Sequence, residues 1–246
     1  MKLVIVRHGE PDYEKDSLTP KGWREAKLLA DRLCREPADA YYCSPLGRAR
    51  DTARDTLQRL GREATVLPWL REFSGTIIDP RTGEESIIWD QMPQYWTRCP
   101  EFFDAGRWLE NPLIQTGDSA AMYQEVCDGL DALLASCGFV RRGMLYAAKE
   151  NCRKTLVLFC HFGVTMMMLS HLLGLSPIPL LHGLILPPTS VSTLATEERR
   201  KGEVFFRCCG LGDVSHLYCA DEPPSRSGRF GEVYEDGYAV RPFIHD

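Results

Sequence analysis

The stretch Leu3-Val4-Ile5-Val6-Arg7-His8-Gly9-Glu10 passes from an apolar run to charged residues at a single peptide bond. The apolar half predicts a buried strand, and open α/β sheets bind their ligands just beyond the carboxyl ends of such strands. An arginine guanidinium matches the oxygens of a phosphate group, and a histidine imidazole can attack phosphorus or donate to it. The stretch therefore favours a phosphate site. A plain strand end beside a surface arginine is the alternative that so short a motif leaves open.

The composition describes a globular protein, with 246 residues, of which 44% are hydrophobic and 26% charged. This predicts one α/β domain over residues 1–246, although the length would also allow two. A net charge of -5 gives no electrostatic case for nucleic acid. The short basic run at 199–201 is interpreted as a solvated turn. The apolar region 155–175 contains His161, Gly163 and His171, which predicts a strand followed by a buried helix and no membrane span.

The ten cysteines follow no disulfide framework and no structural zinc spacing. The strand pattern begins at residue 2, so we expect no cleavable leader. Together these features predict a reduced, cytoplasmic protein without a bound metal.

Strand and helix signals alternate along the chain. Strands are predicted at 2–6, 39–43, 64–67 and 155–160, with further strand-like runs at 189–196 and 204–208. Thr19 is a favourable cap for a helix that begins at Pro20, and a second helix is expected from Ser44 to just before Gly61. An amphipathic helix is predicted over 118–136, and another helix after His161.

Two segments fall outside this alternation. Between about 73 and 117, large aromatic residues crowd a stretch that prolines and glycines interrupt. This aromatic-rich insertion is either a small secondary core or a lid that sets substrate specificity. The polar segment from about 221 to 246 is predicted to lie on the surface as a tail.

Three strand ends share one pattern. Arg7 and His8 follow the first strand, Arg48 lies in the first turn of the helix after the second, and His161 follows the strand at 155–160. If these strands are parallel neighbours, their side chains converge at one edge of the sheet beside a helix N-terminus, which itself favours phosphate. Taken singly, Arg48 could be a solvated helix residue and His161 a hydrogen-bonded core histidine. Their joint placement at the strand ends is harder to explain in this way.

The segments that carry these residues, in order and spacing, resemble the histidine phosphatase superfamily. They are Val6–Glu10, Leu18–Gly22, Ser44–Ala53, Leu70–Glu72, Cys160–Val164 and Gly212–Leu217. The resemblance covers residues 1 to 218. It implies a phosphoglycerate mutase-like fold, which is a three-layer α/β/α sandwich with a mostly parallel central sheet.

The resemblance also implies roles for single residues. His8 matches the nucleophile that becomes phosphohistidine, and Arg7, Arg48 and His161 match the residues that bind phosphate. Glu72 matches the general acid that protonates the leaving alcohol and later activates water. No metal or other cofactor is implied, because these residues supply the positive charge. The other acidic residues that could take the role of Glu72 are Glu84, Glu85 and Asp90.

Two departures from the family pattern narrow the function. Glu14 stands where many members carry a phosphate-binding asparagine, and Glu72 is followed by Phe73-Ser74-Gly75 in place of the mutase signature. Both favour a phosphatase that acts on a small phosphorylated metabolite over a mutase. A non-catalytic domain that binds phosphorylated ligands is a third hypothesis. The substrate and the oligomeric state, a homodimer included, stay open.

Overall fold

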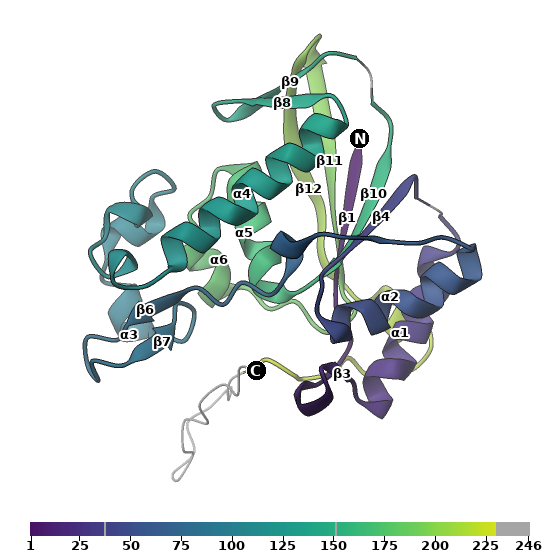
Figure 1. Ribbon diagram of the computed structural model, residues 1–246, viewed down its shortest axis with the longest axis horizontal. Helices are drawn as coiled ribbons and strands as arrows, with labels where there is room; N and C mark the ends of the chain where they lie inside the picture. The colour runs from purple at the N-terminus through teal and green to yellow at the C-terminus, as the bar shows by residue number, and fades with distance from the viewer. Residues whose placement is uncertain (37, 151, 230–246) are drawn as a thin grey trace.

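The computed structural model describes residues 1–36, 38–150 and 152–229, and places β1 (Lys2–Arg7) inside an eight-stranded sheet (Figure 1). On one side of β1 lie β10 (Thr155–Cys160), β4 (Ala40–Cys43) and β5 (Thr65–Val66), all parallel to their neighbours. The register pairs Arg7 with Cys160, and Phe159 with Cys43. The carboxyl ends of these strands are therefore level, as the predicted convergence requires.

The other half of the sheet is antiparallel. It consists of β11 (Val191–Arg200), β12 (Glu203–Asp213), β9 (Leu145–Ala148) and β8 (Phe139–Arg142), in that order outward from β1. The predicted α/β class is confirmed, but the sheet is mixed and not mostly parallel. The difference arises because hairpins, which need only short turns, build this half, whereas parallel strands need long crossovers.

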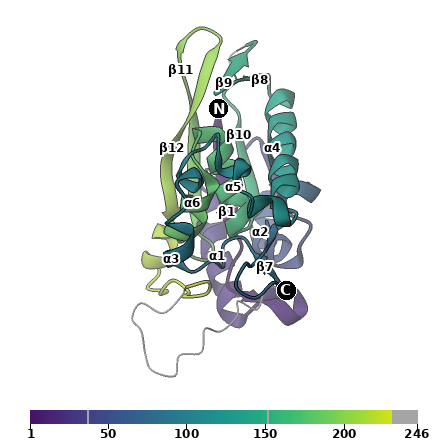
Figure 2. The same cartoon turned by 90° about the vertical axis from the view of Figure 1, so that its left-hand side faces the viewer.

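Helices cover both faces of the sheet and give three layers (Figure 1). One face carries α1 (Pro20–Leu33) and α2 (Gly47–Leu60), with α7 (Ser215–Tyr218) beside α1. The other face carries α5 (Phe162–Leu173), with α4 (Ser119–Ser136) and α6 (Pro177–Gly183) packed against it. Figure 2 shows the β11–β12 hairpin extending beyond these layers. Among the described residues, no helix is both long enough and apolar enough to cross a bilayer.

Most of the predicted helix starts and ends are present in the structure. Thr19 caps α1 by accepting a hydrogen bond from the backbone N–H of Gly22, and Gly61 ends α2 in the left-handed conformation. The second helix begins at Gly47, three residues later than expected. β8 and β9 were not expected, since each has only four residues and no clear alternation. The first prolines that follow Gly174 lie in α6, since a proline in the first helical turn leaves no hydrogen bond unmade.

The aromatic-rich insertion contributes to the main core. Phe102, Trp108 and Ile114 are at most 1% exposed and belong to the apolar cluster under the α4/α5 face. Tyr95 and Phe103, by contrast, are exposed. The buried part of the segment therefore joins the main core instead of forming a small secondary one. Its short elements are β6 (Thr76–Ile78), β7 (Glu85–Ile87), α3 (Pro93–Trp96) and the 3₁₀ turns Pro100–Phe103, Trp108–Glu110 and Ile114–Thr116.

Other short elements lie close to the strand ends. They are β2 (Pro11–Asp12), β3 (Ser17–Leu18) and the 3₁₀ turns Tyr13–Lys15 and Pro68–Leu70.

Candidate active site

The side chains of Arg7, His8, Arg48 and His161 meet at the level carboxyl ends of the parallel strands. We call these four residues the phosphate cluster. The rings of His8 and His161 lie 5.1 Å apart between centroids, at an angle of 56°. All four side chains are buried, with exposures between 0 and 7%. The convergence that the three strand ends predicted is present in the structure.

One ring nitrogen of His8 forms a hydrogen bond with the backbone, and the other is available to a ligand. Its Nδ1 lies 2.7 Å from the carbonyl oxygen of Gly9, which can only accept, so Nδ1 carries the hydrogen and Nε2 keeps its lone pair. Burial, and then the charges of Arg7 and Arg48, hold the pKa of His8 well below its usual value. His8 is therefore a neutral imidazole at physiological pH, with Nε2 able to act as a nucleophile.

The backbone beside His8 is tightly packed. A Cβ at Gly9 would lie 2.9 Å from the carbonyl oxygen of Gly22, so only glycine fits between β1 and α1. The Gly9 N–H donates to the Thr52 hydroxyl at 2.9 Å, which ties this turn to α2. These contacts fix the position of the imidazole.

Two guanidinium groups flank the imidazole. Arg7 donates from Nη1 to the carbonyl of Leu186, and Arg48 donates from Nη1 to Asp16 Oδ1 at 2.8 Å. Both Nε atoms are buried and have no hydrogen-bond partner among the described residues. A buried N–H without a partner is unfavourable unless a ligand accepts from it. The two side chains are thus suited to an anion with several oxygens.

His161 is the N-cap residue of α5. Its Nε2 lies 2.7 Å from the hydroxyl of Ser44, and its Nδ1 is buried without a partner in the described part of the chain. Burial, followed by the neighbouring His8, Arg48 and Arg7, lowers its pKa well below the usual value. His161 therefore adds a polar, neutral group to the cluster.

Glu72 lies against the N-terminus of α5. Its Oε1 accepts from the backbone N–H groups of Phe73 at 2.8 Å, Gly163 at 2.9 Å and Val164 at 3.3 Å. Burial raises the pKa of this carboxyl, although Arg7, Arg48 and these N–H groups oppose the shift. The structure thus places a carboxyl group with a raised pKa beside the phosphate cluster.

The other acidic residues lie elsewhere. Glu84 and Glu85 are exposed at the β6–β7 hairpin. Burial raises the pKa of Asp90, but the charges that act on it are those of Arg81 and Asp79, not those of the cluster. Their placement favours Glu72 for the acid role. Glu14 is exposed in the turn Tyr13–Lys15.

Comparison with known proteins decides the family. The family model of the histidine phosphatase superfamily (branch 1) matches residues 3–207. The chain belongs to this superfamily.

Curated relatives of this histidine phosphatase superfamily member match part of its length. It is 32% identical over 139 residues to phosphoserine phosphatase 1 of Hydrogenobacter thermophilus, a match that covers 51% of this chain and 61% of the relative. It is 38% identical over 82 residues to the adenosylcobalamin/alpha-ribazole phosphatase of Salmonella typhi, covering 30% of this chain and 41% of that one. The matched stretches thus span less than two thirds of each relative.

Solved structures share the fold over most of the chain. The phosphoserine phosphatase of Entamoeba histolytica, solved as a mutant with phosphoserine, superposes with a TM-score of 0.58 at 22% identity, covering 88% of this chain and 98% of that one. A mycobacterial glucosyl-3-phosphoglycerate phosphatase gives a TM-score of 0.56 at 21% identity, covering 86% and 98%. At these identities the likeness concerns the fold.

Sequence reasoning did not single out the residues that hold the phosphate cluster in place. Asp16 anchors Arg48 and also accepts from the backbone N–H of Gly47 at the start of α2. Ser44 holds His161, and Thr52 holds the turn after His8. Ser44 directly follows a strand and could have been noticed for that reason. Asp16 lies in a turn whose contact with α2 depends on the tertiary fold.

The Ser44 contact gives a testable prediction of stability. Ser44→Ala leaves Nε2 of the buried His161 without its partner, so we expect the free energy of unfolding to fall by about 1–3 kcal/mol. Urea unfolding at constant m-value measures this change. Ser190→Ala is the matched control, because the Ser190 hydroxyl is buried and has no partner among the described residues. Equal losses in the two variants would contradict a specific role for the Ser44 hydroxyl.

The described part of the tail does not simply lie on the surface. Ser225 is 3% exposed; its hydroxyl donates to Glu10 Oε2 at 2.5 Å and its N–H donates to Glu25 Oε1 at 3.2 Å. Gly228 has a left-handed φ of 82°, and a Cβ there would lie 3.2 Å from Nη2 of Arg7. Most of residues 221–229 have solvent-accessible side chains, as expected of a surface tail, but Ser225 is buried and Gly228 lies against the guanidinium of Arg7 in the phosphate cluster. Residues 230–246 of the predicted tail lie outside the described residues.

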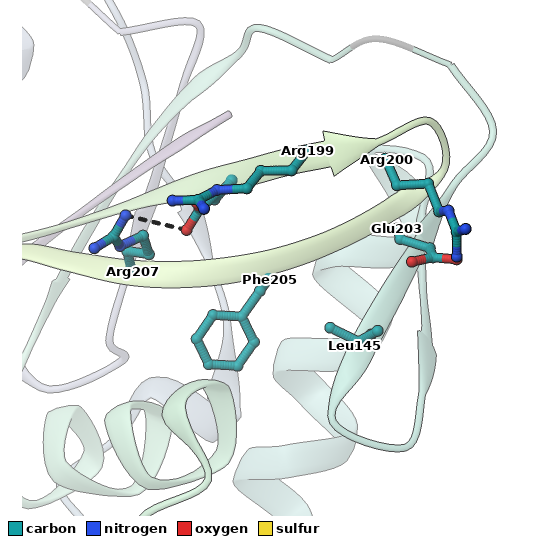
Figure 3. Close-up of a pocket in the computed structure, with 7 residues that line it drawn as sticks. Leu145, Arg199, Arg200, Glu203, Phe205 and Arg207 are labelled. Carbon is teal, nitrogen blue, oxygen red and sulfur yellow. Dashed lines mark hydrogen bonds and ion pairs between the residues drawn. The ribbon is translucent and has the colours of Figure 1, made fainter.

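An open groove of about 510 Å³ beside the β11–β12 hairpin is a separate feature (Figure 3). Its arginines are paired: Arg207 with Glu197 at 3.2 Å, Arg200 with Glu203 at 3.4 Å, and Arg199 with Glu197. The three arginines share two carboxylates, Glu197 and Glu203, which compensate most of their charge, so the groove is a poorer anion site than the phosphate cluster. The basic run at 199–201 lies at the exposed turn of this hairpin, as predicted.

No group of three or more His, Cys, Asp or Glu side chains is arranged to hold a metal ion in residues 1–36, 38–150 and 152–229. All ten cysteines are free thiols.

Proposed function

We propose that the protein is a phosphomonoester phosphatase that hydrolyses a small phosphorylated metabolite through a phosphohistidine at His8, without a metal ion. One observation carries the proposal. The neutral, buried imidazole of His8 lies between two guanidinium groups whose Nε donors have no protein partner, and a carboxyl with a raised pKa lies beside it. This set supplies a nucleophile, positive charge for the phosphoryl oxygens and a proton for the leaving group.

In the first step, Nε2 of His8 attacks phosphorus and the bond from phosphorus to the ester oxygen breaks. Glu72 gives its proton to that oxygen, and the alcohol leaves. Arg7 and Arg48 stabilise the charge on the equatorial oxygens during the transfer, while His161 offers a hydrogen bond. The products are the alcohol, N-phosphohistidine and an ionised Glu72.

In the second step, water attacks the phosphohistidine. The Glu72 carboxylate takes a proton from the water, the bond between phosphorus and Nε2 breaks, and inorganic phosphate leaves. His8 is again neutral and Glu72 again protonated, so the cycle closes. The fixed positive charge of the two guanidinium groups takes the role that a metal ion has in other phosphatases.

Two further observations favour a phosphatase over the alternatives. Curated relatives include phosphatases for phosphoserine and for adenosylcobalamin/alpha-ribazole, although others are probable phosphoglycerate mutases. A non-catalytic domain would need neither a nucleophilic imidazole nor a carboxyl with a raised pKa.

The free cysteines, including the exposed Cys208, Cys209 and Cys219, support a cytoplasmic location.

The test is phosphate release in EDTA. We expect hydrolysis of p-nitrophenyl phosphate and of members of a phosphometabolite panel to proceed at the same rate with and without the chelator, because the guanidinium groups supply the charge. Release of inorganic phosphate from phosphoglycerates, instead of their isomerisation, separates a phosphatase from a mutase. If activity were lost in EDTA and restored by added Mg²⁺, the metal-free mechanism would be refuted. If the protein bound phosphorylated ligands without turning them over, the proposal that it is an enzyme would be refuted.

A further inference from the structure

One ring of the aromatic-rich insertion reaches the proposed acid. A Cβ placed on Gly163 would lie 2.5 Å from Cζ3 and 2.9 Å from Cη2 of Trp89, and 2.8 Å from Oε1 of Glu72. The indole edge and the carboxylate therefore lie within van der Waals reach of the same point, in the first turn of α5. Only a residue without a Cβ at 163 lets both groups occupy this place.

The indole is held rigidly against that turn. Trp89 is 8% exposed, and its ring lies 6.2 Å from the ring of Phe73 and 6.4 Å from that of Phe162, the latter edge to face at 81°. The backbone before it is anchored because the N–H of Ile88 donates to the carbonyl of Gly75 at 3.0 Å. A buried aromatic surface therefore lies at the first turn of α5, beside the place where the Glu72 carboxyl is bound.

The two oxygens of Glu72 differ in their surroundings. All hydrogen bonds that the described residues make to this carboxyl go to Oε1, from Phe73, Gly163 and Val164. Oε2 is therefore the oxygen on which the acid form would carry its proton. Every donor on Oε1 favours the ionised form, so another influence must account for the raised pKa.

Charged and titratable groups around Glu72 also oppose protonation. Arg7 from β1 and Arg48 from α2 both favour a carboxylate. His8 and His161 are held neutral by burial, and burial raises the pKa of the Cys160 thiol to about 12. Exclusion of water is then the one influence that favours the acid, and it exceeds the others.

We propose that Trp89 is a positioning residue for proton transfer: its indole excludes water from Glu72, and so keeps on Oε2 the proton that the leaving alcohol receives. Gly163 is the residue that admits the ring. The inference rests on the proposed function and deepens it, since it gives one residue of the insertion a part in the chemistry. An acid maintained in this way suits substrates with alkyl leaving groups, which cannot depart without a proton.

The direct test does not require turnover. Carbon-13 NMR of protein labelled at glutamate Cδ follows the titration of Glu72, whose signal is assigned as the one missing in Glu72→Gln. We expect Trp89→Ala to lower the titration midpoint by about one pH unit, and Trp89→Phe by less, because water enters beside the carboxyl. Trp108→Phe is the matched control, since Trp108 is an equally buried indole of the insertion that packs on Tyr123. An unchanged midpoint in Trp89→Ala would overturn the proposal.

A kinetic readout separates this role from a structural one. With an alkyl phosphate substrate, kcat declines as pH rises through the pKa of Glu72, and we expect Trp89→Ala to move that decline to lower pH. At pH values well above the pKa of Glu72, its kcat should fall about tenfold for the alkyl phosphate and little for p-nitrophenyl phosphate. Equal losses on both substrates with an unmoved profile would overturn the role of Trp89. Absence of His8-dependent hydrolysis in the unmodified protein would overturn the proposed function, and the NMR titration would still test the contact.

Discussion

His8→Ala is expected to lower kcat for phosphomonoester hydrolysis by a factor on the order of 10⁴ to 10⁶, because it removes the atom to which the phosphoryl group is transferred. Stability should change little in comparison. The measurement is initial release of p-nitrophenol at saturating substrate, together with rapid quenching of protein incubated with labelled substrate. The unmodified protein should retain label that is stable in base and lost in acid, as expected of a phosphohistidine.

His182→Gln is the matched control for this prediction. Burial also lowers the pKa of His182, but its Nδ1 contacts the carbonyl of Ile178 and its ring stacks on Trp96, away from the phosphate cluster. We expect this variant to keep its activity and its label. Retention of substantial activity by His8→Ala, or label in that variant, would place the nucleophile elsewhere.

Glu72→Gln is expected to have an effect that depends on the leaving group. Glutamine cannot donate a proton to the departing oxygen, so kcat for alkyl phosphates should fall on the order of 10² to 10⁴-fold. p-Nitrophenolate leaves without a proton, so the loss in its release should be much smaller. Paired measurements of kcat on the two substrates give the ratio that tests the role.

The sign of the pH dependence follows from the raised pKa of Glu72. Since the acid form is the active form in the first step, alkyl phosphate hydrolysis should persist to higher pH than an ordinary carboxyl allows and should decline as pH rises through the pKa of Glu72. Glu72→Gln should lose this decline. Glu85→Gln, at the exposed hairpin, should change nothing. If Asp90→Asn showed the leaving-group dependence and Glu72→Gln did not, the acid would be Asp90.

The fold could be predicted from local patterns to a considerable extent. The apolar runs that became β1 and β10, the cap at Thr19 and the stop at Gly61 each depend on residues near in sequence. The antiparallel half of the sheet was less visible, because β8 and β9 are short and owe their pairing to long-range contacts. Local propensity says little about such strands.

The phosphate cluster was predictable for a related reason. Arg7, His8, Arg48 and His161 each follow a strong strand signal by a few residues, and parallel strands with level ends bring such residues together. Asp16 and Ser44, which hold the cluster in place, act across contacts between distant segments and carry no comparable signal.

The sequence by itself determined the strand ends, and with them which four side chains meet. Only the tertiary structure decided which carboxyl stands beside them, that Trp89 and Gly163 shape its surroundings, and that residues 221–229 return to Arg7. The physical reason is that protonation and access depend on which groups exclude water from a site. In this protein the insertion and the tail are far from the strand ends in sequence and reach them only in the folded chain.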